Sequence, residues 1–167
     1  MRSHIRLLYL IFFIAASSCS TTRVAKRDNG RVDVVFVQVN DVYEIAPVAG
    51  GKEGGMARAA TVKKEYLRKN PNTFLVMAGD FLSPSVYNSI QYMGQRIRGK
   101  QMVEVMTVAG TNLAVFGNHE FDITEKELKE RINESRFDWV SSNTFKKHNS
   151  KLITLEKRQG ALVTQIT

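Results

Sequence analysis

The sequence has 167 residues, enough for one domain of ordinary size with a buried core, and 43% of them are hydrophobic. Its 24 lysines and arginines exceed its 16 acidic residues, giving a formal net charge of +8, and its single cysteine excludes an internal disulfide. The basic residues are spread over expected helices and loops without interleaved aromatic residues. We therefore expect a solvated basic surface and no nucleic-acid partner.

Residues 1–18 have the features of a secretion signal. Two arginines precede an apolar run over residues 7–16, and small residues lead into Cys19. The run is shorter than the roughly 20 residues that span a membrane. Ala16-Ser17-Ser18-Cys19 resembles a bacterial lipobox, and ordinary signal cleavage with an unused thiol is the alternative. We expect an exported protein of the bacterial cell envelope, held to the membrane by a lipid anchor at Cys19, with a polar tether over residues 19–31.

Hydrophobic periodicity and turn residues predict the elements that follow, in chain order. Val32–Val39 is rich in β-branched residues and is expected to be a buried strand. The further elements are a glycine-rich loop over 44–55, a helix over 56–69, a strand over 73–78, a weakly patterned helical segment over 86–93, a helix over 101–109 and strands over 112–116 and 137–141. Residues 152–166 are predicted to form a hairpin that turns near Gln159-Gly160.

A further helix is expected to begin after Thr124. Thr124 and Glu127 have the spacing of a capping box, and Leu128 with Ile132 forms the pair expected to be buried. Two pairs of opposite charge, Glu125–Lys129 and Glu127–Arg131, are expected on its exposed side.

Polar side chains follow three of the predicted strands. Asp41, Asp80 and the pair Asn118-His119 each come just after a strand. Because alternating strands and helices predict an α/β fold with a mainly parallel sheet, these residues should gather at one edge of it. Carboxylate, amide and imidazole groups bind Zn, Mn or Fe, and two such ions roughly 3.5–4 Å apart can hold a phosphoryl group. Asp122 can accept a hydrogen bond from the His119 imidazole.

The segments around these residues resemble a known family. They are similar to successive motifs of the calcineurin-like metallophosphoesterases, in particular the bacterial 5′-nucleotidase and UDP-sugar hydrolase branch. The similar segments are Asn40–Tyr43, Gly54–Arg58, Ala78–Asp80, Gly117–Asp122 and Ser141–Asn143. The resemblance implies that residues 32–167 form the N-terminal part of a four-layer α/β/β/α sandwich, incomplete at its C-terminal side.

The resemblance also implies a role for each site residue. Asp41 binds the first of two divalent or mixed-valence ions (Zn, Mn or Fe), Asp80 bridges both, and Asn118 binds the second. Hydroxide held by the metal attacks phosphorus in line. His119 stabilises the developing charge or protonates the leaving oxygen, and Asp122 orients it.

The sequence departs from the family pattern at two places. Tyr43 stands where the family has a histidine, and it is either an additional metal ligand or a packing residue. The family completes its site with histidines from later strands, whereas the one histidine after His119 is His148, expected on the surface. Arg58 is expected either to serve a tight turn or to bind substrate phosphate.

Together these features predict a metal-dependent phosphoric ester hydrolase. The expected enzyme is 5′-nucleotidase-like and acts on small phosphate esters, in particular nucleotides, in the cell envelope. The alternative is a truncated, catalytically incompetent lipoprotein that binds metal or phosphate weakly.

Overall fold

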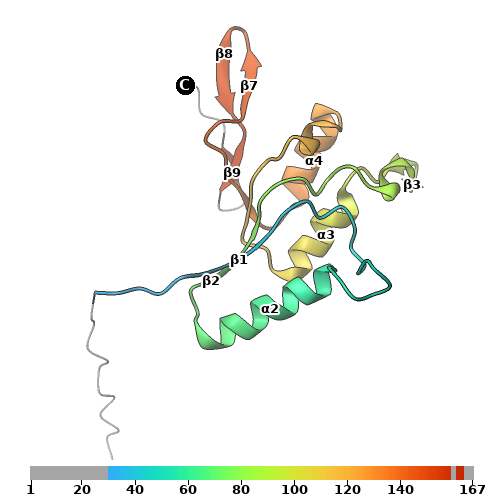
Figure 1. Cartoon of the computed structure of the whole chain (residues 1–167). Coiled ribbons are helices and arrows are strands. Elements are labelled where there is room, and N and C mark those ends of the chain that lie inside the picture. Colours follow the sequence, from blue (N-terminus) through green and yellow to red (C-terminus); the bar gives the residue numbers. More distant parts are fainter. Residues whose placement is uncertain (1–29, 159–160, 164–167) are drawn as a thin grey trace, which may run out of the picture. The chain divides into compact units, whose positions relative to one another are not determined.

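The computed structural model describes residues 30–158 and 161–163 (Figure 1). Two units are distinguished along the chain, residues 1–32 and 33–167, and every element below belongs to the second. The predicted signal segment, the lipidation site at Cys19 and nearly all of the tether lie outside the described residues and stay predictions. Within the described part of the chain, no helix has the length and apolar character needed to cross a membrane.

A six-stranded sheet forms the centre of residues 33–167, in the order β1-β2-β5-β6-β9-β10. Its first four strands are parallel: β1 (Val35–Val39), β2 (Thr73–Met77), β5 (Leu113–Ala114) and β6 (Asp138–Trp139). The last two, β9 (Glu156–Arg158) and β10 (Ala161–Val163), are antiparallel. The prediction of an α/β fold with a mainly parallel sheet is therefore confirmed.

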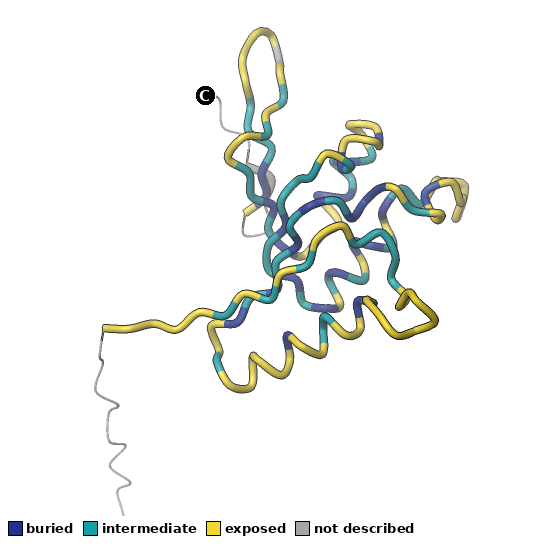
Figure 2. The backbone as a smooth tube through the Cα atoms, viewed as in Figure 1, coloured by how far each residue is buried: buried dark blue, intermediate teal, exposed yellow. Residues whose placement is uncertain are grey.

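Three helices connect the parallel strands: α2 (Met56–Lys69), α3 (Lys100–Ala109) and α4 (Glu125–Glu134). Because the parallel strands join the sheet in sequence order and such crossovers are right-handed, the helices lie on one face of the sheet. Helix α2 packs on β1, β2 and α3, and α3 contacts α4 (Figure 1). Buried positions concentrate between the strands and these helices (Figure 2), and they include Leu75, Met77, Met102, Met106 and Ile132.

Strand β1 corrects one expectation. The buried strand predicted over Val32–Val39 begins only at Val35 and forms an edge of the sheet. Its side chains alternate between half-buried and exposed, and Phe36 is 65% exposed. The residue types predicted a strand correctly, but burial depends on which faces neighbouring elements cover, and that information is not local.

The apolar residues of α2 do not all face the core. The spacing of Met56, Ala59, Ala60, Tyr66 and Leu67 predicts a single helical face, but Met56 alone of these is buried, and Tyr66 and Leu67 are exposed. Lys63 takes a buried position instead, with its ammonium group donating to the carbonyl of Gly110 and to Asn112 Oδ1. A lysine can occupy such a position because its alkyl stem packs with apolar neighbours while its amine finds polar partners.

Helix α4 begins as the sequence predicts. The capping box between Thr124 and Glu127 is present, Leu128 and Ile132 are buried, and Glu125 and Lys129 form an ion pair at 2.6 Å. The prediction of a second ion pair, between Glu127 and Arg131, is wrong.

Arg131 points inward, where it donates to the carbonyl of Ile97 at 3.0 Å and pairs with Glu134 at 2.8 Å. Glu127 pairs instead with Arg98 at 3.5 Å. Carbonyl groups of the loop before α3 thus attract the guanidinium away from the exposed side of α4.

Short elements fill the remaining connections. The segment after β2 contains a 3₁₀ helix, η1 (Val86–Ser89), and a small hairpin of β3 (Gln91–Tyr92) and β4 (Gln95–Arg96), and a second 3₁₀ helix, η2 (His119–Phe121), follows β5. A hairpin of β7 (Phe145–His148) and β8 (Lys151–Thr154) was not predicted. The predicted C-terminal hairpin is present, but it begins at β9 rather than at residue 152, and its turn at 159–160 lies outside the described residues.

Strand β9 is fastened to the end of α4 by a buried lysine. Lys157 is 3% exposed, and its ammonium group donates to the carbonyls of Ile132 at 2.8 Å and Asn133 at 3.1 Å. The last carbonyls of a helix have no partner within the helix, so this contact, together with the Ser135 hydroxyl that donates to Ile132, satisfies them.

Candidate active site at the strand ends

The turns after β1 and β2 run side by side. Beyond the regular ladder, the Ala78 N–H donates to the Val39 carbonyl at 2.8 Å and the Asp41 N–H donates to the Gly79 carbonyl at 3.1 Å. Asp41 and Asp80 both have left-handed backbone angles, with φ of 53° and 59°. Aspartate tolerates this region better than most residues do, so it suits two tight turns that leave their strands abruptly.

The turn after β5 packs directly against the turn after β2. A Cβ atom on Gly79 would lie 2.7 Å from the backbone nitrogen of Gly117, a distance that no side chain permits. The His119 N–H donates to Asp80 Oδ1 at 2.8 Å. The structure therefore brings together the three strand ends that the sequence singled out.

Both oxygens of the Asp41 carboxylate accept hydrogen bonds from residues within two positions of it. The Asn40 amide donates to Oδ2 at 2.6 Å, and the Tyr43 hydroxyl donates to Oδ1 at 3.1 Å. These two bonds hold the pKa of Asp41 below its ordinary value. Burial, followed by the bond to Asp41, raises the pKa of Tyr43 to about 12, so at neutral pH its side chain is a neutral phenol.

His119 and Asp122 are in contact. The Asp122 carboxylate lies 2.7 Å from His119 Nδ1, and this hydrogen bond raises the pKa of the imidazole above its ordinary value. The Tyr43 ring meets the imidazole edge-on, with 6.0 Å between ring centroids. The imidazole is thus oriented from two sides, by a carboxylate and by an aromatic ring.

Three more side chains join this arrangement, and of these the sequence singles out only Glu120, either as an acceptor behind the site or as a helix-entry residue. Asn40 donates to Asp41, the Ser83 hydroxyl lies 3.4 Å from Asp122 Oδ2, and Glu120 is buried behind the turns. Asn40 and Glu120 lie inside the motifs, but motif membership does not indicate which group they contact.

Of the two remaining predicted site residues, Asn118 lies beside His119, whereas Arg58 contacts the glycine-rich loop. Asn118 stands at the N-cap position of η2 without a capping side-chain hydrogen bond, and it is exposed beside His119, where its amide is open to a ligand. Arg58 donates to the carbonyl of Gly54 at 2.9 Å and to that of Gly51. Its guanidinium therefore orders the glycine-rich loop, and a contact with substrate phosphate stays a prediction.

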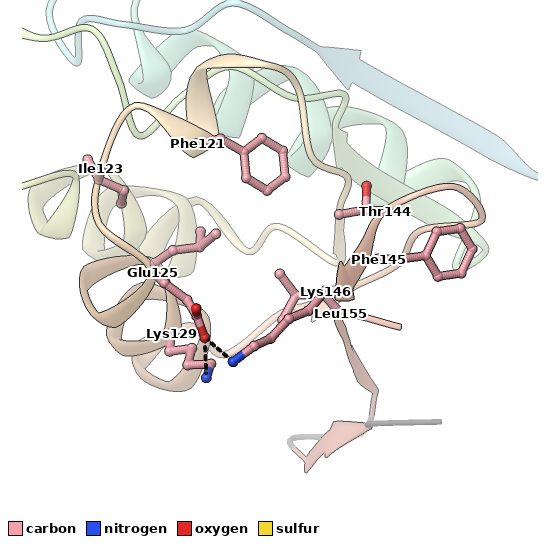
Figure 3. A pocket seen from close by; sticks show the side chains of 9 residues that line it. Phe121, Ile123, Glu125, Lys129, Thr144, Phe145, Lys146 and Leu155 are labelled. Carbon is pink, nitrogen blue, oxygen red and sulfur yellow. Dashed lines mark hydrogen bonds and ion pairs between the residues drawn. The ribbon is translucent and has the colours of Figure 1, made fainter. Parts of the chain in front are cut away.

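A separate cavity of about 300 Å³ lies beside this cluster's last turn (Figure 3). Phe121, Ile123, Leu128 and Leu155 contribute apolar lining, while Glu125 on the rim pairs with Lys129 and Lys146. Asp41, Asp80, Asn118 and His119 do not line it. The candidate active site is therefore an open surface at the strand ends and not this cavity.

Residues 34–158 match the family model of the calcineurin-like phosphoesterases. The chain belongs to this family. The predicted family membership is confirmed, and the matched range spans all three strand-end turns.

Solved structures show the same fold at low identity. A 5′-nucleotidase precursor from Thermus thermophilus is 23% identical, with a TM-score of 0.57 over 80% of this chain and 28% of that one. A putative 5′-nucleotidase from Staphylococcus aureus, in complex with alpha-ketoglutarate, is 17% identical, with a TM-score of 0.53 over 71% of this chain and 27% of that one.

The calcineurin-like phosphoesterase YfkN from Bacillus subtilis is 19% identical, with a TM-score of 0.48 over 80% of this chain and 46% of that one. The chain thus spans less than half the length of each of these structures. No curated protein matches its sequence significantly.

Calcineurin-like phosphoesterases generally use two divalent metal ions, and the donors at the strand ends fit part of that requirement. Asp41 and Asp80 offer carboxylate oxygens and Asn118 an amide oxygen, all suited to divalent ions. Among the described residues, however, no group of three or more His, Cys, Asp or Glu side chains is arranged to hold a metal ion. Three oxygen donors of this kind are too few to complete the coordination spheres of two metal ions.

Proposed function

We propose that this chain is the N-terminal part of a metal-dependent phosphoric ester hydrolase of the 5′-nucleotidase type, acting on nucleotides in the bacterial cell envelope. Its membership of the calcineurin-like phosphoesterases supports the reaction class. The observation that carries the proposal is the meeting of Asp41, Asp80 and the Asn118-His119 turn at neighbouring strand ends.

In this proposal Asp41, Asp80 and Asn118 hold the metal ions, with Asp80 between the other two. Metal ions bound there would polarise the phosphate ester and activate the attacking water. Asn40 and Tyr43 keep Asp41 ionised and oriented by donating to Oδ2 and Oδ1.

His119 is the proton donor to the leaving oxygen. Its hydrogen bond to Asp122 leaves Nε2 free to face the substrate, and the raised pKa keeps more of the imidazole protonated near neutral pH. Asp122 therefore fixes both the orientation and the charge of the donor.

The test is turnover of an aryl phosphate and of AMP by the purified chain with Mn²⁺, Zn²⁺ or Fe²⁺. We expect His119→Ala to lower the turnover rate by roughly 10²–10⁴, the contribution of a positioned proton donor. His148→Ala, which removes an imidazole from hairpin β7–β8, is the matched control and should leave the rate unchanged. An unchanged rate in His119→Ala would remove His119 from the mechanism.

The alternative function is a lipoprotein that binds metal or phosphate weakly without efficient catalysis. The incomplete donor set among the described residues favours it. Weak Mn²⁺ binding together with no turnover of either ester would support this alternative and contradict catalysis by this chain.

A further inference from the structure

Glu120 is a charged side chain in an unusual place. It directly follows His119, yet it is 0% exposed. Burying a carboxylate is costly unless its oxygens accept hydrogen bonds. Within the described residues, no lysine, arginine or histidine hydrogen-bonds or forms an ion pair with it, and backbone N–H groups provide its contacts.

Four backbone donors converge on this carboxylate. Oε2 accepts from the N–H of Asp80 at 2.8 Å and of Gly117 at 2.6 Å. Oε1 accepts from the N–H of Phe81 at 2.8 Å and of Leu82 at 3.2 Å. Both oxygens therefore face the protein backbone, and neither is directed at a substrate or a metal ion.

The donors come from two different turns. Asp80, Phe81 and Leu82 follow β2, whereas Gly117 follows β5. A second link between the same two turns runs through Asp80, whose Oδ1 accepts from the His119 N–H at 2.8 Å. The two turns are thus joined twice, once by the buried carboxylate of Glu120 and once by the carboxylate of Asp80.

We propose that Glu120 is a positioning residue whose buried carboxylate fixes the spacing between Asp80 and the turn that carries Asn118 and His119. This inference rests on the proposed function to the extent that Asp80 and Asn118 bind metal. A site for two ions tolerates little variation in the distance between its ligands, and outer groups that hold ligands in place strongly affect metal affinity.

Two substitutions of Glu120 distinguish the effect of its side-chain length from the effect of its negative charge. Glu120→Gln keeps the shape, but its NH₂ group replaces one acceptor and meets backbone donors that it cannot pair with. Glu120→Asp keeps the charge and shortens the side chain, so its carboxylate cannot reach both turns. Glu156→Gln is the matched control, because Glu156 is also buried, at 8% exposed, and its carboxylate accepts from the backbone of Ser141 and from Arg158 rather than from the turns after β2 and β5.

The first measurement is amide hydrogen exchange in the metal-free full chain. We expect Glu120→Gln to speed exchange at Asp80, Phe81 and Gly117 more than in the helices, and Glu156→Gln to leave these amides unchanged. Unchanged exchange at both turns in Glu120→Gln would overturn the proposal. If Glu120→Gln does not fold, Glu120→Asp is measured in the same way.

The second measurement is Mn²⁺ affinity by calorimetry, at a temperature where circular dichroism shows each variant to be folded. We expect a loss of roughly 10-fold to 100-fold in both Glu120 variants, the scale seen for groups that orient metal ligands. Wild-type affinity in Glu120→Asp would overturn spacing as the cause. A wild-type chain that binds no Mn²⁺ would contradict the proposed function, while the exchange experiment would still decide whether Glu120 holds the two turns together.

Discussion

At the scale of single residues, Tyr43 contacts Asp41, the expected ligand of the first metal ion. Its hydroxyl donates to Oδ1, and its pKa of about 12 means that it loses this proton only at a cost in free energy. An imidazole at the same position would instead offer a neutral nitrogen that binds a metal ion directly. The side chain at position 43 therefore affects how tightly the first metal ion is held.

We expect Tyr43→His to tighten Mn²⁺ or Zn²⁺ binding by roughly 10-fold or more, the scale on which a changed partner alters a metal site. Metal titration followed by calorimetry measures this affinity. Tyr43→Phe is the control, since it removes the hydroxyl without adding a ligand and should give no such gain. Equal affinity in Tyr43→His and the wild type would indicate that Tyr43 itself is an adequate ligand.

At the scale of elements, helix α4 depends on its first turn. Thr124 accepts from the Glu127 N–H at 3.3 Å, and Glu127 accepts from the Thr124 N–H at 2.8 Å. These two bonds satisfy backbone donors that have no partner within the helix. The start of α4 also follows directly on the turn that contains Asp122.

Thr124→Ala should therefore lower the free energy of unfolding by about 1 kcal/mol, the usual effect of losing an N-cap side chain. Urea denaturation followed by circular dichroism measures the change. Thr61→Ala is the matched control, because Thr61 is exposed within α2 and donates only to the carbonyl four residues before it. A loss in Thr61→Ala as large as that in Thr124→Ala would argue against a specific capping effect.

Sequence patterns predicted the helices better than the strands. The bounds of α2 agree residue for residue, because glycine, proline and periodicity act within a few positions. The strands predicted at 112–116 and 137–141 shrink to two residues each, since regular pairing depends on neighbours far along the chain.

In the candidate site, too, local features were predictable from the sequence and contacts between distant residues were not. The strand-end positions of Asp41, Asp80 and Asn118-His119 were predictable from local motifs. The contacts of Glu120 were not, because its partner Asp80 lies 40 residues earlier in the sequence. Nor did periodicity indicate that Lys63 and Arg131 turn inward, as their partners are carbonyls of distant loops.

At the scale of the whole unit of residues 33–167, the two faces of the sheet differ. Leu75 and Met77 are fully buried under the helices, whereas Phe36 on β1 is 65% exposed. Phe36 has its nearest aromatic contact with Phe74 of the neighbouring strand, at 6.0 Å between ring centroids. Phe36 thus leaves apolar surface open to solvent.

This difference predicts unequal effects of substitution. Leu75→Ala should cost roughly 2–5 kcal/mol of stability because it leaves a cavity in the core. Phe36→Thr should stay within about 0.5 kcal/mol, because a mostly exposed side chain loses little burial. Urea unfolding of both variants measures the contrast, and a loss in Phe36→Thr as large as that in Leu75→Ala would show that this face is covered in solution.

The two buried lysines have a chemical consequence. Burial lowers the pKa of both amines, but the fold shields both from reagents, so a reagent meets each amine only after it is exposed to water again. Lys63 joins α2 to the start of β5, and Lys157 joins β9 to the end of α4. Acylation of either amine therefore requires a local opening. The acylation rate of Lys63 would therefore report how often the contact between α2 and the start of β5 opens. The acylation rate of Lys157 would report how often the contact between β9 and α4 opens.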